Sequence, residues 1–258
     1  FDALNTEADA IKQFRDQNIP VVSFEDLGSG SSYTNLTINE LYDEPKLPGE
    51  NYRWGREYFF MRDEFQEATP RTFENCVKGL LLTFGGTDQH NLTEKIFFAI
   101  RETCKQRDIH VYIVTGPGYH EDSNLARVVS GDNDVTFTHA TGVMSRIMEH
   151  CEVAITSNGR TVYELAHMNI PAIVIDQHQR ENTHHFACKD NGFIGIGIYR
   201  PGQTEDIVNQ VLTEFLDDRS QRKNLFDRTR RHNFSIAKDK IVKSLIDLAK
   251  DAGSTRAM

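Results

Sequence analysis

From residue 76 onward, the spacing of hydrophobic residues alternates between two patterns, one typical of strands and one typical of helices. Short apolar runs such as "GLLLTF" (79–84) have the length and flanking turns of buried strands. Most are followed by a longer segment whose apolar residues recur three or four positions apart, the spacing of one helix face. We predict strands at 79–84, 110–116, 134–138, 152–156, 170–176 and 193–199, and helices at 92–106, 142–151, 159–168, 180–192 and 204–216. Such alternation is typical of an α/β fold with a doubly wound parallel sheet, Rossmann-like in architecture.

One helix shows the pattern clearly. In the segment 92–106 the residues Leu92, Ile96, Ile100 and Cys104 recur every four positions. Residues four apart lie above one another on the same side of a helix. We therefore expect these four side chains to form one buried stripe against the sheet.

The first 75 residues follow a different pattern. A helix is predicted at about 6–17 and a strand at 19–24, after which an irregular, aromatic-rich stretch continues to the start of the parallel unit. One strand–helix unit with a long connection is too little for an independent domain. So long a connection in a compact protein is usually functional or docks on something. The chain also begins at Phe1 rather than at a methionine. We interpret this region as the remaining part of a first domain whose beginning is absent.

Two further helices are predicted near the end of the chain, at about 219–231 and 235–250. The second has a stripe of apolar residues at three- and four-residue spacing: Ile236, Ile241, Leu245 and Leu248. The stripe can pack back on the N-terminal part or form a dimer contact. We predict three regions: 1–75, a partial N-terminal domain with its linker; 76–216, a nucleotide-binding domain; and 217–258, helices that pack on the N-terminal part.

Charge and composition exclude several classes of protein. The formal net charge of −9 over 258 residues argues against a nucleic-acid-binding protein, which needs a basic surface. The basic stretch 218–232 is interpreted as a solvated helix face. No apolar run approaches the ~18 residues of a membrane span, and no signal peptide opens the chain.

The cysteines indicate the compartment. Cys76, Cys104, Cys151 and Cys188 are far apart and show neither metal-site spacing nor a disulfide framework. We expect free, buried thiols in the reducing cytoplasm, without a metal site. No motif for a cofactor is present.

The glycines at residues 85 and 86 form the first candidate binding site. Gly85 and Gly86 follow the first strand of the parallel unit, with Thr87 next, directly before a helix. Glycine lets backbone N–H groups approach an anion, and the start of a helix favours phosphate. The alternative is a tight turn with Asp88 or Asn91 as the helix cap. The stretch is neither a GxGxxG motif nor a P-loop.

Two more polar loops follow strands of the same sheet. The turn Ser157-Asn158-Gly159 precedes a helix that carries Glu164 in its first turns. That carboxylate can stabilise the helix end or accept hydrogen bonds from a ribose diol. The loop "DQHQRENTHHF" (176–186) supplies Gln177, Gln179, Asn182 and Thr183, which suit a sugar or a phosphate. His184 and His185 are adjacent, so they point about 100° apart on a helix and cannot share one ligand. We expect one of them to be half-buried packing.

These loops meet at one sheet edge, because parallel strands end on the same side. Together they describe a pocket for a nucleotide or a nucleotide-sugar.

At this point three segments resemble a known family. They are "LLLTFGGTDQHNLT", "VTFTHATGVMSRIMEHCEVAITSNGRTVYELAHMNIPAIVI" and "QRENTHHF…NGFIGIG". They resemble the C-terminal half of a GT-B enzyme, in particular the UDP-sugar hydrolase of pseudaminic acid biosynthesis. A related module is fused behind the cytidylyltransferase domains of CMP-sialate-type synthetases. The lipid II N-acetylglucosaminyltransferase is similar more distantly. The resemblance covers about residues 19–200.

The resemblance assigns roles to residues of this chain. The residues that it places beside the phosphates are Gly85, Gly86, Thr87, Ser157, Asn158 and Gly159. The backbone of the segment from Thr138 to Met144 would read the edge of the uracil, and Glu164 would hold the ribose hydroxyls. The residues expected against sugar or phosphate are Gln179, Asn182 and Thr183. The implied ligand is a UDP-sugar, although the sequence leaves uracil and cytosine as alternatives.

The chain departs from the hydrolase at one important point. In that family the catalytic histidine lies on a glycine-rich loop near the start of the first domain, and this sequence has no such segment. No catalytic residue can therefore be assigned by motif; His120, His139 and His178 near the sheet edge are interpreted as polar surface.

Two function classes stay open. The chain is either a UDP-sugar hydrolase or glycosyltransferase-like enzyme fragment whose chemistry lies upstream, or a non-catalytic module for oligomerisation or nucleotide sensing, as in a bifunctional cytidylyltransferase. A nucleotide-binding α/β protein unrelated to sugars is a third, weaker reading. A homodimer, or a fusion to an upstream nucleotidyltransferase domain, is the expected protein partner.

Overall fold

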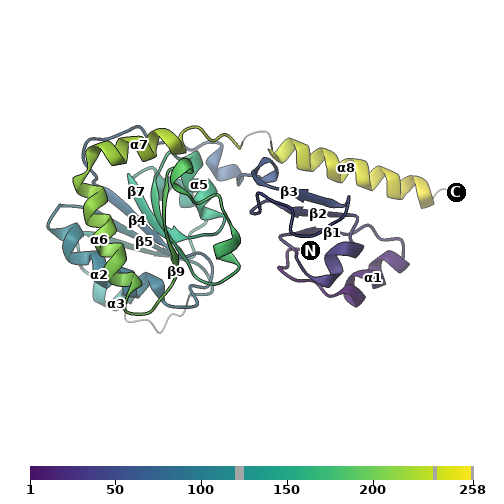
Figure 1. Cartoon of the computed structure of the whole chain (residues 1–258), viewed down its shortest axis with the longest axis horizontal. Coiled ribbons are helices and arrows are strands. Elements are labelled where there is room, and N and C mark those ends of the chain that lie inside the picture. Colours follow the sequence, from purple (N-terminus) through teal and green to yellow (C-terminus); the bar gives the residue numbers. More distant parts are fainter. Residues whose placement is uncertain (120–124, 235–236, 257–258) are drawn as a thin grey trace. The chain divides into compact units, whose positions relative to one another are not determined.

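The structure is a computed structural model that describes residues 1–119, 125–234 and 237–256. The chain divides into two compact units, each with its own sheet (Figure 1). Unit 1 comprises Phe1–Met61 and Asn233–Met258, and unit 2 comprises Arg62–His232. We describe each unit by itself.

Unit 2 contains a six-stranded sheet in which every neighbouring pair of strands is parallel. Its order is β6-β5-β4-β7-β8-β9. The strands are β4 (Gly79–Thr83), β5 (His110–Thr115), β6 (Val135–His139), β7 (Val153–Ser157), β8 (Ala172–Asp176) and β9 (Phe193–Ile198). Since β5 and β6 lie on one side of β4 and β7 to β9 on the other, the sheet is doubly wound, and the predicted fold class is confirmed.

Helices cover both faces of this sheet. They are α2 (Leu92–Lys105), α3 (Leu125–Val129), α4 (Met144–Met148), α5 (Thr161–His167), α6 (Thr204–Asp217) and α7 (Arg219–Thr229). Figure 1 shows α2, α3 and α6 along one face and α5 beside the other. The predicted stripe of α2 is confirmed, because Leu92, Ile96, Ile100 and Cys104 are all buried in the core that α2 and α6 share with the central strands.

One predicted helix is wrong. The segment 180–192 forms two short 3-10 helices, η4 (Glu181–Thr183) and η5 (Lys189–Asn191), instead of a continuous α-helix closed by glycine. The amide of Asn158 donates to the carbonyl oxygens of Glu181 and His184, at 3.1 and 3.0 Å. The side chain of Asn158 therefore occupies these two carbonyl groups. A continuous α-helix would use both of them as acceptors of its own backbone hydrogen bonds.

Unit 1 contains a smaller parallel sheet of the order β1-β2-β3. Its strands are β1 (Val22–Phe24), β2 (Leu36–Asn39) and β3 (Tyr52–Trp54), and its helices are α1 (Ala8–Asp16) and α8 (Ala237–Arg256), with the 3-10 helices η1 (Ser29–Tyr33) and η2 (Arg56–Tyr58). The sequence interpretation missed β2 and β3. The polar residue Thr37 inside β2 is buried because its hydroxyl bonds Ser23 and Thr34, at 2.9 and 2.6 Å. Buried polar residues hide a strand from a pattern based on apolar residues.

Helix α8 covers one face of the unit 1 sheet, and α1 lies on the other side (Figure 1). Ile241 of its apolar stripe is buried against Leu36 and Ile38, and Leu245 and Leu248 pack against the same cluster. Ile236, the first residue of the predicted stripe, lies outside the described residues. The stripe therefore packs within unit 1.

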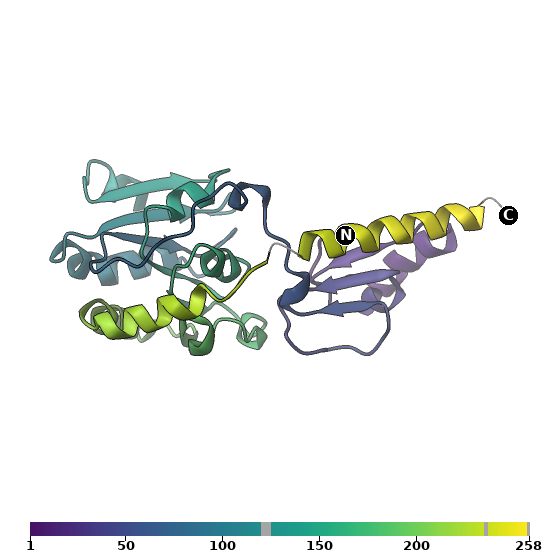
Figure 2. The same ribbon diagram turned by 90° about the horizontal axis from the view of Figure 1, so that it is seen from above.

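The compact units divide the chain at different positions from the predicted regions. Residues 62–75 and 217–232 belong to unit 2. The reason is visible in Figure 2, where the segment that starts at Arg62 runs along unit 2 in an extended form. Arg222 of α7 donates from Nη2 to the carbonyl oxygen of Asn75, at 2.6 Å, and ties the two stretches together. That unit 1 is the remnant of a larger first domain stays a prediction.

Candidate functional site

The loops singled out in the sequence gather at the carboxyl edge of the unit 2 sheet. The order of the strands reverses beside β4 and β7, so the loops after these two strands leave toward opposite faces. Such a switch point is where open parallel sheets bind ligands. The two small-residue turns, after Phe84 and at Ser157, lie at this position.

The turn after β4 is shaped by glycines. Gly85 has φ +76°, a left-handed conformation that favours glycine. A β-carbon on Gly116, after β5, would lie 2.5 Å from the α-carbon of Gly86, so the two turns can pack this closely only without a side chain there. Gly118 donates its N–H to the carbonyl oxygen of Gly86, at 2.9 Å. The β5 turn therefore holds the Gly85-Gly86 turn in place from one side.

The backbone donors of this turn are unused among the residues that the structure describes. Within residues 1–119, 125–234 and 237–256, the N–H groups of Gly85, Gly86 and Thr87 donate no hydrogen bond. Gly86 and Thr87 are exposed. Three successive N–H groups held by glycine geometry form a concave donor surface for an anion.

The start of α2 is already occupied. The buried carboxylate of Asp88 accepts from the N–H groups of Leu92 and Thr93, at 2.7 and 2.8 Å. This is the capping role that the sequence offered as the alternative for Asp88, and Asn91 makes no capping bond with its side chain. The turn 85–87, rather than the end of α2, is thus the part that can receive an anion.

The turn after β7 lies against the first. The position of a β-carbon on Gly85 is 4.0 Å from Oγ of Ser157, and a β-carbon on Gly159 would meet nothing within 4 Å. Space is therefore open beside Gly159. Ser157 and Asn158 are buried, whereas Gly159 is half-buried.

Asn158 joins this turn to the loop after β8. Its amide donates to three oxygens, including Oδ1 of Asp176 at 2.9 Å and the carbonyl oxygens of Glu181 and His184. In return Nδ1 of His184 bonds the carbonyl oxygen of Asn158 at 2.7 Å. The side chain and the carbonyl oxygen of Asn158 are therefore engaged within the protein, where they hold the loop after β8 against this turn.

Burial perturbs the titratable groups of this cluster. Burial raises the pKa of Glu181 to about 7, although the bond from the N–H group of Gln177 to its Oε2, at 2.6 Å, opposes the rise. Burial also raises the pKa of Asp176. Burial lowers the pKa of His184 to about 4, so this histidine is neutral at pH 7. His184 is buried and His185 is exposed. The sequence analysis expected one of the two to pack in a half-buried position, and the buried one is His184.

The loop after β8 presents the remaining polar candidates. Nε2 of Gln177 donates to the carbonyl oxygen of Phe84, at 3.1 Å, and fixes the loop beside the glycine turn. Gln179 and Asn182 are exposed, and their side chains have no hydrogen-bond partner in the described part of the chain. The hydroxyl of Thr183 donates to the carbonyl oxygen of Arg180 within the loop, at 2.7 Å. Gln179 and Asn182 are therefore available to a ligand, and Thr183 is engaged.

Glu164 forms an ion pair in the structure. Its Oε1 accepts from Nε of Arg62 at 3.0 Å, and its side chain is 9% exposed. Burial raises its pKa, and Arg62 opposes that rise. The second oxygen, Oε2, has no partner among the described residues, yet it is not one of their fully enclosed polar atoms. One oxygen of Glu164 is thus held by Arg62 and the other can still accept a bond.

Arg62 is also connected, through Glu64, to the segment that was predicted to contact the uracil base. Its Nη1 pairs with Glu64 at 2.7 Å, and Oε2 of Glu64 accepts from the N–H of Ser145 at 2.9 Å, at the start of α4. Met144, the first residue of α4, is half-buried. The ribose candidate and the base-reading segment are therefore linked through two residues of the stretch that enters unit 2.

The base-reading segment itself begins in the edge strand β6. Thr138 is half-buried there and pairs in register with Val114. The N–H of Ala140 donates to the carbonyl oxygen of Thr115, at 2.8 Å, and Nδ1 of His139 bonds the Thr115 hydroxyl, at 3.0 Å. From Ala140 to Val143 the segment is mostly exposed, which leaves its backbone accessible.

Two of the three histidines that the sequence analysis places near the sheet edge, His139 and His178, lie in the described part of the chain. His120 lies outside the described residues. His178 is exposed and its Nδ1 accepts from the N–H of Glu181, at 3.3 Å, while His139 bonds Thr115. In the described part of the chain no group of three or more His, Cys, Asp or Glu side chains could hold a metal ion.

Sequence reasoning missed four residues at this edge of the sheet. Gly116 and Gly118 flank a proline directly after a strand, a signal that marks a third turn at the same edge. Glu181 stood in the polar loop without being singled out, and its burial could not be inferred from its neighbours. Arg62 belongs to a stretch more than 100 positions before Glu164, so no local pattern links the two.

The expectation for the thiols was partly wrong. All four cysteines are free, but only Cys104 and Cys151 are buried, whereas Cys76 and Cys188 are exposed. The exposed pair lies in connecting segments outside the core, where no apolar stripe requires burial. Among the described residues no helix is both long and apolar enough to cross a membrane.

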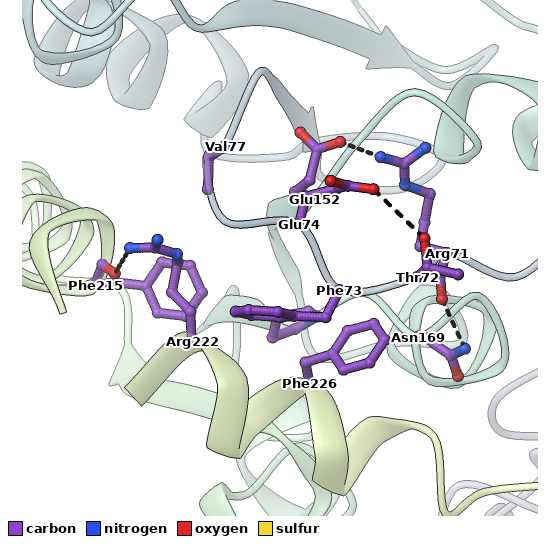
Figure 3. Close-up of a pocket in the computed structure, with 11 residues that line it drawn as sticks. Arg71, Thr72, Phe73, Glu74, Val77, Glu152, Asn169, Phe215, Arg222 and Phe226 are labelled. Carbon is purple, nitrogen blue, oxygen red and sulfur yellow. Dashed lines mark hydrogen bonds and ion pairs between the residues drawn. The ribbon is translucent and has the colours of Figure 1, made fainter. Parts of the chain in front are cut away.

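A separate pocket lies at the opposite, amino edge of the same sheet. Figure 3 shows Arg71 directed toward Glu152, and Phe73 placed near Arg222 and Phe226. Phe73 and Phe226 meet edge to face, with ring centroids 5.6 Å apart. Several residues around this pocket are bound to one another, such as Arg71 with Glu152, and none of the sequence candidates lies there.

Comparisons with known proteins agree with this geometry. The family model described as the glycosyltransferase family 28 C-terminal domain matches residues 80–242. MJ1062 of Methanocaldococcus jannaschii is 28% identical over 194 residues, which are 69% of this chain and 40% of that protein. The spore coat polysaccharide biosynthesis protein SpsG of Bacillus subtilis is 23% identical over 215 residues, which are 79% of this chain and 63% of that protein. The chain thus spans less than two thirds of either curated relative.

Solved structures share the fold. MurG of Acinetobacter baumannii, the lipid II transferase of the distant resemblance, superposes with a TM-score of 0.58 at 15% identity, covering 92% of this chain and 69% of that one. The UDP-GlcNAc 2-epimerase of Neisseria meningitidis, solved with UDP-GlcNAc, gives 0.62 at 14% identity, covering 92% and 72%. At these identities the likeness concerns the fold alone, and it supports the GT-B architecture.

Proposed function

Because the chain belongs to the family of the glycosyltransferase family 28 C-terminal domain, we propose that unit 2 binds a UDP-sugar at the carboxyl edge of its sheet. The pyrophosphate lies against the turn Gly85-Gly86-Thr87, with Gly159 on its other side. The ribose hydroxyls bind Glu164, and the backbone between Thr138 and Met144 reads the uracil. Gln179 and Asn182 contact the sugar.

One observation carries the proposal. In the described part of the chain, three successive N–H groups, from Gly85 to Thr87, donate no hydrogen bond; they lie at the switch point of a doubly wound sheet, in a turn against which Gly116 and Gly118 pack. Backbone donors fixed in this way suit a diphosphate, because they need no reorganisation when the anion arrives. The relatives of known structure that were solved with UDP or a UDP-sugar support the choice of nucleotide.

The site supports breaking the bond between sugar and phosphate. Donors around the pyrophosphate stabilise the negative charge of departing UDP, which is the leaving group of both glycosyl transfer and hydrolysis. A general base that activates water or an acceptor hydroxyl lies outside the residues assigned here. We place that base in a part of the whole protein beyond this unit, in line with the shorter span of this chain relative to its curated relatives.

The identity of the sugar and its fate are the next part of the proposal. The resemblance to the pseudaminic acid hydrolase favours a diacetamido sugar of the kind used for nonulosonic acids, and SpsG supports a place in polysaccharide biosynthesis. A hydrolase releases UDP and free sugar without an acceptor, whereas a transferase needs one. Product analysis of the whole protein with and without an acceptor separates the two.

The first test is a calorimetric titration with UDP, CDP and CMP. We expect UDP to bind and Glu164→Ala to weaken binding by about 1–3 kcal/mol, the effect of losing hydrogen bonds to a ligand. The loss should be much smaller with 2′-deoxy-UDP, since one ribose hydroxyl is then missing in both proteins. Glu102→Ala, an exposed carboxylate on α2, is the matched control. If no uridine nucleotide binds, the proposal fails and the non-catalytic oligomerisation module takes its place.

A further inference from the structure

Arg62 is shared between two carboxylates that belong to different parts of the proposed site. Its Nε donates to Oε1 of Glu164 at 3.0 Å, and its Nη1 pairs with Oε1 of Glu64 at 2.7 Å. The other oxygen of Glu64 accepts from the N–H of Ser145 at 2.9 Å, next to the first residue of α4. A continuous chain of bonds therefore joins the carboxylate proposed for the ribose to the end of the segment proposed for the base.

The position of Arg62 is fixed by the short 3-10 helix that follows it, η3 (Asp63–Phe65). Phe65 is 1% exposed, and its carbonyl oxygen accepts from Nε2 of His167 at 3.2 Å. His167 lies on α5, one helical turn after Glu164. The guanidinium of Arg62 stands over the ring of Phe65, 5.3 Å from its centroid. Arg62 is thus anchored to α5 through Phe65 as well as through Glu164.

The ion pair determines how Glu164 can meet a ligand. Its Oε1 is held by Arg62, so the carboxylate cannot rotate freely and Oε2 keeps one direction. An ionised carboxylate only accepts hydrogen bonds, and each oxygen has two lone pairs, so Oε2 alone can accept from both hydroxyls of a ribose. Burial raises the pKa of Glu164, and Arg62 opposes that rise. Arg62 therefore preserves both the charge and the orientation that a diol requires.

Arg62 also separates two like charges. Besides burial, the charge of Glu64 raises the pKa of Glu164, because the two carboxylates repel each other. Their side chains are only 14% and 9% exposed, so neither can turn fully to water. Removing the guanidinium would leave both carboxylates without their counter-charge. The loss of Arg62 should therefore displace Glu164 and Glu64 together, and with Glu64 the start of α4.

We propose that Arg62 is a positioning residue for the nucleoside, which with Glu64 holds the ribose carboxylate and the base-reading segment in one fixed arrangement. The inference rests on the proposed function. Arg62 and Glu64 touch neither the ribose nor the base, and they act on both through the groups that they hold. The preference for ribose over 2′-deoxyribose depends on Arg62, and the grip on the base depends on Glu64.

The test is titration calorimetry of this chain with UDP and 2′-deoxy-UDP, which carry the same phosphates and the same base. We expect the wild type to bind UDP about tenfold more tightly, the effect of one hydrogen bond to a charged group. Arg62→Met keeps the stem over Phe65 and removes the charge. It should weaken UDP binding about fifteenfold and 2′-deoxy-UDP binding about threefold, so that the preference falls to about twofold.

The conservative variant Arg62→Lys keeps the charge. Its single ammonium cannot bond both carboxylates in the fixed geometry of a guanidinium. We expect a partial rescue, with a preference for UDP of about fivefold.

Two further variants assign the role. In Glu164→Ala the oriented carboxylate is absent, so adding Arg62→Met should weaken UDP binding only about threefold instead of fifteenfold. Glu64→Ala frees the N–H of Ser145 and loosens the base-reading segment. 2′-Deoxy-UDP should then bind about threefold more weakly, as it does in Arg62→Met.

The matched control is Arg101→Met. The side chain of Arg101 is 40% exposed, compared with 44% for Arg62, and it pairs with Asp132 at 2.8 Å. Neither Arg101 nor Asp132 belongs to the proposed site, so the variant should bind both nucleotides as the wild type does.

The outcomes separate this inference from the proposed function. Equal losses for the two nucleotides in Arg62→Met, or no ribose preference in the wild type, overturn the inference and leave UDP binding intact. A fifteenfold loss that persists in the Glu164→Ala background also overturns it, because Arg62 would then contact the ligand itself. Absence of UDP binding by the wild type overturns both. If circular dichroism shows that Arg62→Met does not fold, the ratio in Arg62→Lys decides, and an unchanged tenfold preference or equal losses there overturn the inference.

Discussion

The two edges of the unit 2 sheet are built from similar residues but use them differently. At the amino edge, Glu152 pairs with Arg71 and accepts from the N–H groups of Lys78 and Gly79, both at 2.8 Å. At the carboxyl edge, backbone N–H groups from Gly85 to Thr87 have no partner in the described part of the chain. A closed network stabilises the fold, whereas unused donors are available for a ligand. The difference predicts where a substitution costs stability and where it costs binding.

The largest effect is expected at the amino edge. Glu152→Ala removes the partner of Arg71 and the acceptor of two N–H groups, and should lower the free energy of unfolding by about 3 kcal/mol. Its side chain is only 12% exposed. Urea unfolding measures the loss. UDP affinity of the folded variant should be unchanged. The control is Asp217→Ala. Asp217 pairs with Arg107 but its side chain is 63% exposed, so the free energy of unfolding should change by no more than about 0.5 kcal/mol. Equal losses in both variants would contradict the closed network.

Low pH should reduce the free energy of unfolding mainly through titratable groups at the carboxyl edge of the unit 2 sheet. The pKa of His184 is lowered to about 4, so its contribution to stability is present above its ordinary pKa of 6.5 and is lost as the pH falls through about 4. Over that interval we expect a loss of roughly 2–3 kcal/mol that His184→Gln does not show. Unfolding curves at pH 4, 5, 6 and 7 measure it. His185→Gln, the exposed neighbour, should behave as the wild type. Glu181 acts with the opposite sign: its contribution is present below about 4.5 and is lost as the pH rises through about 7.

A single methyl group should disturb the binding turn. In Gly116→Ala the new β-carbon would lie 2.5 Å from the α-carbon of Gly86, so the turn must move. We expect at least a roughly tenfold weaker affinity for UDP-GlcNAc, with a loss of unfolding free energy of about 1–3 kcal/mol. In the control Gly195→Ala the nearest atom is 3.7 Å away, and binding should be unaffected. Normal affinity in Gly116→Ala would mean that the turn does not hold the phosphates.

The smallest effect is expected at the rim of the site. Asn182 is exposed and its side chain has no partner among the described residues, so Asn182→Ala should change unfolding by less than about 0.5 kcal/mol. If it contacts the sugar, affinity for UDP-GlcNAc falls about twofold to fivefold while affinity for UDP is unchanged. Asn133→Ala, in the exposed loop before β6, is the control. An equal loss with UDP would assign Asn182 to the nucleotide.

Much of the unit 2 fold could be predicted from its sequence. The strands β4, β7 and β8 are buried along their whole length and appear as continuous apolar runs. Helix α2 shows its buried stripe because its outer face is polar. Local sequence was insufficient where a distant side chain decides the structure: Asn158 binds the carbonyls of Glu181 and His184, and the segment 180–192 does not become a helix.

The same limit applies to the site. Glycines after strands and the polar loop residues could be identified, because those residue types have distinct roles at the end of a strand. The engagement of Asn158, the burial of Glu181 and the pair between Arg62 and Glu164 could not, since each depends on a residue brought from elsewhere in the chain. Residue types at the ends of strands could be identified from the sequence, whereas the buried contacts beneath them could not.

The stretch from Arg62 to Gly79 has a consequence for the order of folding. It pairs with Glu164, 102 positions later, and Asn75 accepts from Arg222, 147 positions later. Contacts this distant in sequence require closure of long loops, which makes them slow to form. During synthesis the pair with Glu164 and the bond from Arg222 can therefore form only after those later residues have been translated. The first stretch of unit 2 is thus held by its last helix, α7.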